Sequence, residues 1–382
     1  MTVRDGDVTL AAGGDRPTDP SPPEAAEASS ATPWPRAIMH LDMDAFFAAV
    51  YLLSHPEDVG KPVAVGGQPG SRGVVAAASY EARQFGVHSG MPASRAARLC
   101  PNLKMVSHDW PTIAEKSRLV RQVLSEYGPV EPMSVDEAFV DLSDHDDPPA
   151  VAAAAQQHVM EATRLPASVG LATSKLVAKV ASDFGKPHGC TIVQPGDEAD
   201  FLAPLNVRVI SGIGPRTAER LLELGIETCG DLADADLDAL TVAMGPHAAY
   251  LPSRALGIDR RSVREHRGPP RSISAERTFS SDITDRDELL GRLRELSARV
   301  GKSLRRREMV AWTVTVRFRW ADFTTFTRQQ SVSVPIDADD DIYDCAQAIW
   351  FEHWPPGQPV RLIGVGVSRL EKPVARQLTL DL

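Results

Sequence analysis

Short apolar runs alternate with stretches of helical periodicity over the first half of the chain. Compact apolar runs predict buried strands, and apolar residues spaced three or four apart predict amphipathic helices. The predicted strands are residues 37–41, 62–65, 73–77, 130–133, 138–142, 168–171 and 190–193. The predicted helices are residues 46–53, 80–85, 112–127, 151–164 and 175–184. Strands separated by helical segments indicate an α/β core.

The second half divides into a helical segment and a mixed segment. Residues 194–259 show helical patterns, and a Gly-x-Gly turn at 212–214 opens one helix. Pro269 and Pro270 mark a linker. The pattern then predicts strand 272–279, helix 287–306, strands 310–319 and 324–334, helix 342–353 and strand 360–370. This βαββαβ order is that of a compact two-layer unit, so we expect an α/β multidomain protein.

Composition excludes several classes of protein. The 382 residues are 43% hydrophobic and 24% charged, which is ordinary for a folded protein of roughly two to four domains. No apolar run approaches the roughly 18–20 residues of a membrane span, and the acidic N-terminus lacks a secretory apolar region. The four cysteines are far apart and form no CxxC pair, which favours the cytoplasm and neither disulfides nor zinc. Residues 1–35 are rich in Asp, Pro, Ala and Ser, and we expect a disordered tail.

The net charge of −10 is unevenly distributed. Between Arg254 and Arg328 there are 18 Lys and Arg residues against 10 Asp and Glu residues, so the rest of the chain is strongly acidic. A basic segment on an acidic body is typical of a surface that follows nucleic-acid phosphates. A solvated charged surface explains the charge alone equally well.

Two acidic pairs lie beside predicted strands. Asp42 and Asp44 follow the first strand, and Asp136 and Glu137 precede the apolar run 138–140. On one sheet these carboxylates would lie close together, and they would repel one another unless divalent cations neutralised them. Carboxylate oxygens suit Mg²⁺, and two such ions about 3.5–4 Å apart stabilise the attacking and leaving oxygens of a phosphoryl transfer. Ordinary strand-end and turn acids remain the alternative on spacing alone.

Four sequence blocks resemble the signature of the Y-family DNA polymerases. They are Leu41-Asp-Met-Asp-Ala-Phe-Phe-Ala-Ala-Val50, Ser79-Tyr-Glu-Ala-Arg83, Ser134-Val-Asp-Glu-Ala-Phe139 and Ser182-Asp-Phe-Gly-Lys-Pro-His-Gly189. The resemblance runs in the family's order from about residue 36 to residue 382. It implies a right-hand polymerase with a ferredoxin-like palm (36–44 and 109–193), small fingers (45–108), a helical thumb with a helix-hairpin-helix (194–262), a linker (263–270), a βαββαβ little finger (271–370) and a clamp-binding tail (371–382).

The resemblance implies a template-directed, low-fidelity translesion DNA polymerase without proofreading, which adds deoxynucleotides to a primer 3′-hydroxyl. Asp42, Asp136 and Glu137 would be the catalytic carboxylates. They would hold two Mg²⁺ ions per active site, with the backbone carbonyl of Met43 as a further ligand. Asp44 is expected to be structural.

The nucleotide-binding residues implied by the resemblance are Phe47, Tyr80, Arg83 and Lys186. Tyr80 and Arg83 lie three apart and therefore on one helix face, where arginine can bind phosphate oxygens in a bidentate manner. Phe47 matches the family's steric gate, whose ring would clash with a 2′-hydroxyl. Small residues over 73–79 predict weak checking of base-pair shape. Without the resemblance, surface ion pairs and a core aromatic residue explain these positions.

Further segments point to DNA and to a protein partner. Gly212 and Gly214 would let backbone N–H groups approach a DNA phosphate, and Arg317 and Arg319 share one face of a strand. By resemblance, the terminal segment 377–382 docks on the β sliding clamp. The clamp-binding residues would be Gln377, Leu378, Leu380 and Leu382. The expected partners are primer-template DNA, deoxynucleoside triphosphates and the clamp, and we expect a monomer that does not bind a membrane.

Two other functions compete with this interpretation. A catalytically silent DNA-binding repair scaffold would share the fold, but all three metal carboxylates are present in this chain. A palm-domain nucleotide cyclase could use similar carboxylates and Mg²⁺, but it would need no DNA-gripping segments.

Overall fold

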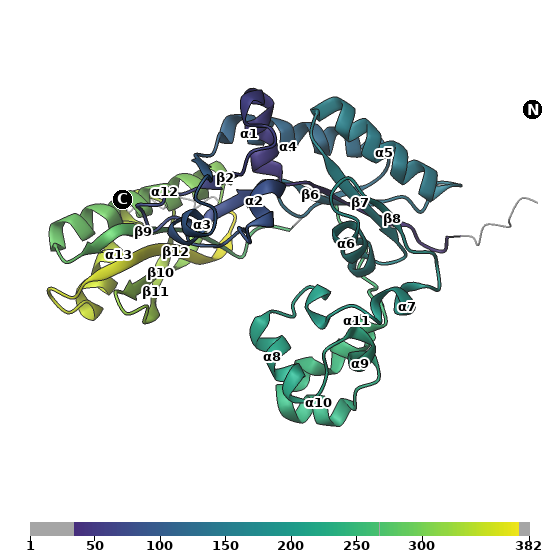
Figure 1. Ribbon diagram of the computed structural model, residues 1–382. Helices are drawn as coiled ribbons and strands as arrows, with labels where there is room; N and C mark the ends of the chain where they lie inside the picture. Colours follow the sequence, from purple (N-terminus) through teal and green to yellow (C-terminus); the bar gives the residue numbers. More distant parts are fainter. Residues whose placement is uncertain (1–33, 267, 374–382) are drawn as a thin grey trace, which may run out of the picture. The chain divides into compact units, whose positions relative to one another are not determined.

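The structure is a computed structural model that describes residues 34–373 except residue 267 (Figure 1). The predicted tail therefore lies outside the described residues over 1–33, as does the terminal segment 374–382. The elements of the first half are β1 (Ile38–Met43), α1 (Phe46–Ser54), η1 (Pro56–Asp58), β2 (Val63–Gly66), β3 (Val75–Ala78), α2 (Tyr80–Gln84), α3 (Ala93–Leu99), β4 (Lys104–Val106), α4 (Trp110–Leu124), β5 (Val130–Pro132), β6 (Glu137–Asp141), α5 (Pro148–Thr163), β7 (Ala167–Ala172), α6 (Lys175–Phe184) and β8 (Cys190–Ile192). Those of the second half are α7 (Glu198–Leu202), η2 (Val207–Val209), α8 (Pro215–Glu223), α9 (Cys229–Ala233), α10 (Leu237–Met244), η3 (Pro246–Tyr250), α11 (Leu251–Ala255), β9 (Ser272–Ile283), α12 (Arg286–Arg306), β10 (Val310–Trp320), β11 (Thr325–Ile336), α13 (Asp339–His353) and β12 (Val360–Glu371).

The first half of the chain has a five-stranded sheet in the order β5-β6-β1-β7-β8. Asp42 lies in β1 and Glu137 in β6, and Asp44 and Asp136 lie just outside these strands. β1 is central and antiparallel to both β6 and β7. Because side chains alternate along a strand, Met39 and Leu41 enter the core shared with α4 and α5, whereas Ile38 packs with α6. Asp42 therefore lies on the face of the sheet that α6 covers.

Gly170 in β7 fixes how closely α6 approaches this sheet. A Cβ atom at this position would lie 2.1 Å from the carbonyl oxygen of Ala178 and 2.3 Å from the backbone nitrogen of Ser182. Only glycine allows this contact between helix and strand. The close packing holds the polar side chains of α6 beside the end of β1.

A small three-stranded sheet in the order β3-β2-β4 packs against α2 and α3 through Ala82 and Ala96. The sequence patterns predicted β2, β3 and α2 but missed α3 and β4. Strand β4 pairs in parallel with β2, a long-range contact that its three residues do not reveal.

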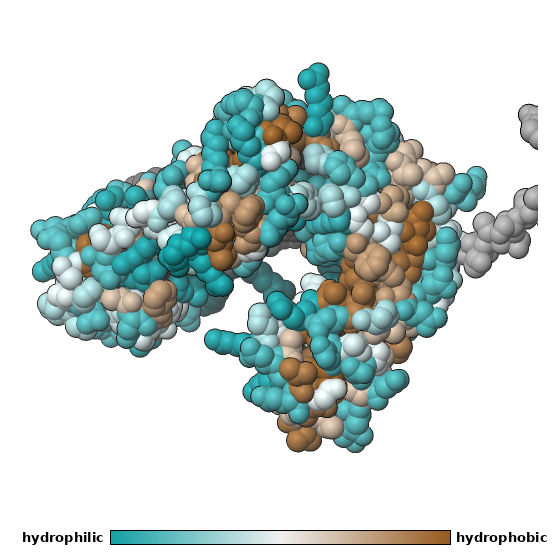
Figure 2. Space-filling model, in the orientation of Figure 1, coloured by the Kyte–Doolittle hydropathy of each residue, from teal (hydrophilic) through white to brown (hydrophobic). Residues whose placement is uncertain are grey.

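The segment from α7 to α11 is helical, as predicted. Gly214 is the N-cap of α8 and Pro215 is its first residue, a position where proline loses no intrahelical hydrogen bond. α10 leaves Leu237 and Val242 exposed, and Figure 2 shows hydrophobic atoms at the surface over this helix.

The predicted βαββαβ unit is confirmed and forms a four-stranded sheet in the order β11-β10-β12-β9. α12 and α13 pack on one face of this sheet (Figure 1). The buried side chains of α12 recur every three or four residues: Leu289, Leu293, Leu296, Val300 and Leu304. The first strand extends to Ile283, beyond the predicted end at residue 279.

Candidate active site

The register of two neighbouring strands brings two carboxylates face to face. Asp42, near the end of β1, lies opposite Glu137 at the start of β6. The backbone N–H of Met43 donates a 3.0 Å hydrogen bond to the carbonyl of Asp136, which fixes the preceding loop beside β1. Both acidic pairs thus lie at one edge of one sheet, because antiparallel pairing places the end of β1 beside the start of β6.

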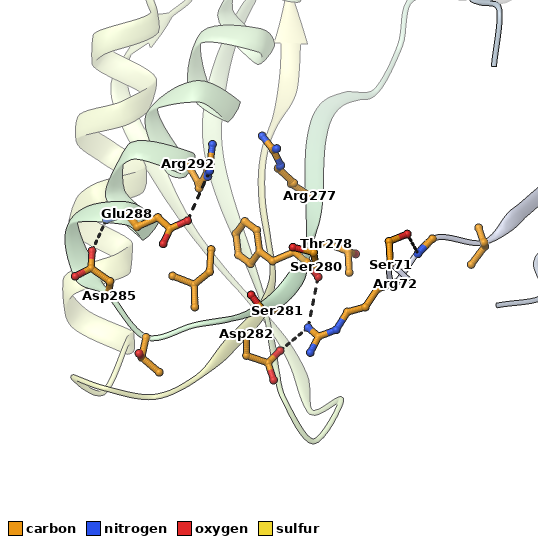
Figure 3. Close-up of a pocket in the computed structure, with 15 residues that line it drawn as sticks. Ser71, Arg72, Arg277, Thr278, Ser280, Ser281, Asp282, Asp285, Glu288 and Arg292 are labelled. Carbon is orange, nitrogen blue, oxygen red and sulfur yellow. Dashed lines mark hydrogen bonds and ion pairs between the residues drawn. The ribbon is translucent and has the colours of Figure 1, made fainter. Parts of the chain in front are cut away.

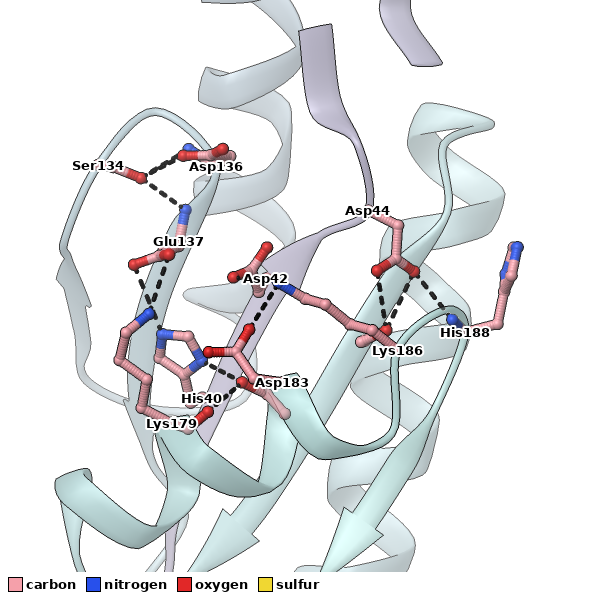
Figure 4. Close-up of polar contacts among 12 residues, drawn as sticks. His40, Asp42, Asp44, Ser134, Asp136, Glu137, Lys179, Asp183, Lys186 and His188 are labelled. Carbon is pink, nitrogen blue, oxygen red and sulfur yellow. Dashed lines mark hydrogen bonds and ion pairs between the residues drawn. The ribbon is translucent and has the colours of Figure 1, made fainter. Parts of the chain in front are cut away.

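Two lysines from α6 and the turn after it neutralise this edge (Figure 4). Lys186 Nζ lies 2.7 Å from Asp42 Oδ2, and Lys179 Nζ lies 2.9 Å from Glu137 Oε1. Burial raises the pKa of Asp42 to about 7, an effect that Lys186 opposes and the nearby Glu137 increases. The site is therefore a partly buried acidic edge that holds positive charge.

Asp136 faces away from the other two carboxylates (Figure 4). Its Oδ1 accepts a hydrogen bond from the hydroxyl of Ser134, whose oxygen accepts from the backbone N–H groups of Asp136 and Glu137 at 3.1 and 3.0 Å. Across residues 34–266 and 268–373, no three His, Cys, Asp or Glu side chains are arranged to hold a metal ion. The predicted convergence of three carboxylates is thus not seen with these side-chain positions.

The donor set nevertheless fits a hard divalent cation. The candidate ligands are all oxygen atoms, which Mg²⁺ prefers. Burial raises the pKa of Asp42 although Lys186 contacts it, and a bound cation would stabilise the charged form of this carboxylate. We therefore treat Asp42, Asp136 and Glu137 as the residues able to hold metal.

Asp44 has a different environment from Asp42. It is buried, and its carboxylate accepts hydrogen bonds from Ser168 Oγ at 3.0 Å, from the His188 backbone N–H at 2.9 Å and from the Tyr80 hydroxyl at 3.2 Å. These bonds join β1, β7, α2 and the turn after α6. The Asp44 carboxylate is thus engaged in hydrogen bonds within the protein, and its expected structural role stays a prediction.

Tyr80 and Arg83 lie on α2, as predicted. The Arg83 guanidinium carbon is 4.7 Å from the centroid of the Tyr80 ring, and the exposed Arg83 donates to the Ala78 carbonyl at 3.1 Å. Burial and the neighbouring Asp44 raise the pKa of Tyr80 to about 12, so its hydroxyl remains a neutral donor. The hydrogen bond to Asp44 places Tyr80 beside the acidic edge. Lys186 contacts the acidic edge directly through Asp42.

His40, Lys179 and Asp183 complete the site and were not predicted from the sequence. His40 is fully buried, and its Nδ1 lies 2.7 Å from Ser182 Oγ. Burial lowers the pKa of His40 well below its ordinary value, so the ring is neutral. Asp183 Oδ1 lies 2.8 Å from Lys186 Nζ. The available signal was the spacing of residues 179, 183 and 186, which places three charges along one side of α6 and its extension.

The predicted DNA contacts occupy two other regions. Gly212 has a φ of +102°, which favours glycine, and the turn is braced by Arg254, whose Nη1 donates to the Ser211 carbonyl at 2.9 Å. Arg317 and Arg319 project from β10 on the face opposite Phe318, which packs against Trp350 of α13. The two arginines thus share one face of β10, as the alternation predicted, and the structure shows that this face lies away from the helices.

The clamp-binding residues Gln377, Leu378, Leu380 and Leu382 lie outside the described residues, so their prediction stays untested.

A hollow of about 730 Å³ lies between residues 71–74 and the segment formed by β9 and the start of α12 (Figure 3). Arg72 Nη1 lies 2.5 Å from Asp282 Oδ1 and 3.5 Å from the Phe279 carbonyl oxygen. None of the acidic residues at the end of β1 lines this hollow. It is therefore separate from the candidate active site.

Three family models match the chain. A model described as the impB/mucB/samB family matches residues 41–183, its C-terminal domain matches residues 270–380, and a SAM-like helix-hairpin-helix tandem matches residues 207–247. A solved Y-family DNA polymerase chimera aligns with a TM-score of 0.78 and 26% identity, covering 88% of this chain and all of that one. The DNA polymerase IV of Dehalococcoides mccartyi strain CBDB1 is 40% identical over 91% of this chain and 90% of its own length.

The chain belongs to the Y family of DNA polymerases. The DNA polymerase IV of Staphylococcus aureus strain JH9 is likewise 37% identical over 90% of this chain and 98% of its own length. The expected Y-family fold and the expected DNA-directed DNA polymerase are thereby confirmed. These relatives fit an active translesion polymerase and not the catalytically silent scaffold.

Polymerases of this family depend on metal ions and bind primer-template DNA and nucleotides. No helix within the described part of this polymerase is both long and apolar enough to cross a membrane.

Proposed function

We propose that this polymerase adds deoxynucleotides to a primer 3′-hydroxyl by in-line phosphoryl transfer, with low fidelity and without proofreading. The observation that carries this proposal is the pairing of Asp42 with Glu137 across β1 and β6, with Lys186 in contact with Asp42. Residues 36–44 and 109–193 form the palm, 45–108 the fingers, 194–262 the thumb and 271–370 the little finger.

Asp42, Asp136 and Glu137 would hold two Mg²⁺ ions, with the backbone carbonyl of Met43 as a further ligand. When bound, the ions would lower the pKa of the primer hydroxyl and neutralise charge on the departing pyrophosphate. The residues themselves supply the anionic oxygens, and the packing of α6 on Gly170 holds their lysine partners in place.

Lys186, Arg83 and Tyr80 bind the triphosphate. Lys186 provides a point charge, Arg83 is exposed and can form paired hydrogen bonds, and Tyr80 supplies a neutral hydroxyl. Phe47 excludes a ribose 2′-hydroxyl by steric clash. The small residues from Gly73 to Ser79 leave space around the nascent pair, which supports tolerance of damaged templates.

The DNA backbone is held by the turn at Gly212 and Gly214 and by Arg317 and Arg319. Neither group reads base edges, in agreement with a polymerase that must accept any template sequence. The terminal segment 377–382 docks on the β sliding clamp, and the polymerase acts as a monomer in the cytoplasm.

The test is primer extension by the full chain and by Asp136→Asn. We expect templated products from the native chain and loss of at least about a hundredfold in rate from the variant, the scale set by other electrostatic catalytic groups. Asp146→Asn, an exposed acid, is the matched control. A cyclic nucleotide made without template would favour a cyclase, and extension unaffected by Asp136→Asn would contradict the proposed site.

A further inference from the structure

The start of α4 presents two aromatic side chains on either side of a helix cap. Asp109 is the N-cap residue, and its carboxylate accepts hydrogen bonds from the Thr112 backbone N–H at 3.3 Å and from the Thr112 hydroxyl at 2.6 Å. Pro111, inside the first turn, further restricts the backbone. His108 directly precedes this cap and Trp110 directly follows it, so the cap fixes the backbone from which both side chains project.

The two aromatic rings lie parallel to each other. His108 and Trp110 are stacked, with centroids 5.5 Å apart and an angle of 4° between their planes. Trp110 is 54% exposed, so burial alone does not account for its position. We call these two side chains the aromatic wall.

Phe47 stands edge-on against the aromatic wall. Its ring centroid lies 5.7 Å from His108 and 5.6 Å from Trp110, with interplanar angles of 74° and 71°. Both contacts have the edge-to-face geometry that aromatic pairs favour. Phe47 also contacts Phe46, the first residue of α1, at 5.8 Å. The ring is thus restrained by contacts from α1 and from α4.

The space beside Phe47 is too small for the ring to retreat into. The cavity between α1 and the start of α4 has a volume of about 50 Å³ and is lined by Phe47, Val50, Ser107 and Ile113 among others. A cavity that accepts benzene is about three times larger. Displacement of the Phe47 ring towards α4 therefore requires the aromatic wall to move.

We propose that Trp110, stacked on His108, is a positioning residue that holds the Phe47 ring and thereby sets the discrimination between deoxyribose and ribose. This inference rests on the proposed role of Phe47 as the steric gate. A gate excludes a 2′-hydroxyl only as strongly as its ring resists displacement. The aromatic wall supplies that resistance from outside α1.

The experiment compares incorporation of deoxynucleotides and ribonucleotides by the full chain and by Trp110→Ala, Trp110→Phe and Phe47→Ala. The readout is the ratio of kcat/KM for the two sugars. For Trp110→Ala we expect this ratio to fall about three- to tenfold, the range that the loss of one aromatic pair contact produces. Trp110→Phe, which retains a ring, should restore most of the ratio. Phe351→Ala, which removes an exposed aromatic ring of α13, is the control and should leave the ratio unchanged.

A double variant tests whether Trp110 acts through Phe47. In the Phe47→Ala background, Trp110→Ala should cause no further fall in the ratio, because the ring that it positions is absent. A further fall of similar size would overturn the inference. If Phe47→Ala lowers the ratio but Trp110→Ala does not, the inference alone is wrong. If Phe47→Ala leaves the ratio unchanged, the proposed gate is wrong and the inference with it. A merely structural role of Trp110 would lower kcat/KM for both sugars equally, which would also overturn the inference.

Discussion

Lys186 and Asp42 form an ion pair in which both side chains are largely removed from water. Nζ lies 2.7 Å from Oδ2, and the side chains are 21% and 8% exposed. Loss of one partner of such a pair leaves the other charge uncompensated. The partners are not equivalent, because Lys186 also contacts Asp183, whereas Asp42 has no second ion-pair partner among the described residues.

Lys186→Met should therefore destabilise the protein more than Asp42→Asn does. We expect the free energy of unfolding to fall by about 1–3 kcal/mol at pH 8 in Lys186→Met. Without Lys186, the pKa of Asp42 lies further above its ordinary value. A carboxyl group with a raised pKa favours the folded state at low pH, and this contribution is lost as the pH rises through that pKa. The variant should therefore lose more stability at pH 8 than at pH 5. Urea unfolding at pH 5 and pH 8 in chelator, with the exposed Lys302→Met as control, measures this. Equal losses at both pH values would contradict the argument.

Asp44→Asn should lower stability by a different route. An amide nitrogen cannot accept the hydrogen bonds that Ser168, His188 and Tyr80 donate to the Asp44 carboxylate. We expect a loss of about 1–3 kcal/mol, with at least one buried donor left unpaired. Thermal unfolding of Asp44→Asn and Asp42→Asn side by side checks this. If the two variants melted at the same temperature, the structural role of Asp44 would be refuted.

The local elements of the site were predictable because each has its own periodicity. The helix at Lys175–Phe184 matches its predicted bounds, and the acids beside β1 and β6 follow from apolar runs that end or begin at a carboxylate. The side-chain contacts between α6 and the sheet, and the direction of Asp136, were not predictable. The pairing of Lys179 with Glu137 depends on how closely α6 packs on Gly170, and the direction of Asp136 depends on a turn closed by Ser134. No residue spacing in the sequence indicates the Lys179–Glu137 pair or the direction of the Asp136 side chain.

Asp58 should make the stability of the protein depend on pH in the acidic range. Its side chain is buried, and hydrogen bonds from Lys104 at 2.5 Å and Tyr51 at 2.8 Å hold its pKa at about 2. A lowered carboxyl pKa gives stability that is present above its ordinary value near 4 and is lost as the pH falls to 2. Asp58→Asn should melt at a lower temperature at pH 7 and lose less stability between pH 4 and pH 2. Parallel curves for the two proteins over that range would argue against this role.

Deletion of residues 377–382 should separate two kinds of synthesis. An extended peptide that docks on the clamp gives affinity without contributing to the active site. We therefore expect the truncated chain to lose stimulation by the β sliding clamp while its distributive primer extension stays unchanged. Primer extension on a circular template with and without loaded clamp measures both. A comparable loss in the absence of clamp would count against docking.

Arg317 is held by an acidic partner that DNA phosphates would have to replace. Its Nη1 lies 2.7 Å from Glu276 Oε1, across the intervening Gly364 of β12. A Cβ atom at Gly364 would lie 2.7 Å from Cγ of Glu276, so glycine makes room for this bridge. A DNA phosphate can bind the exposed Arg317 only if the ion pair with Glu276 breaks. This ion pair is exposed and contributes little stability, so breaking it costs little free energy.

Arg317→Ala should weaken DNA binding at every sequence and reduce the slope of log affinity against log salt by about one. Glu276→Gln should have the opposite effect on affinity at low salt, because it frees the guanidinium. Arg294, whose Nη1 lies 2.9 Å from Asp340 Oδ1 on the helical face, provides the matched control, and Arg294→Ala should leave the slope unchanged. Fluorescence anisotropy with a labelled primer-template over a salt series measures all three. If Arg294→Ala and Arg317→Ala changed the slope equally, the open face of the sheet would not be the surface that holds DNA.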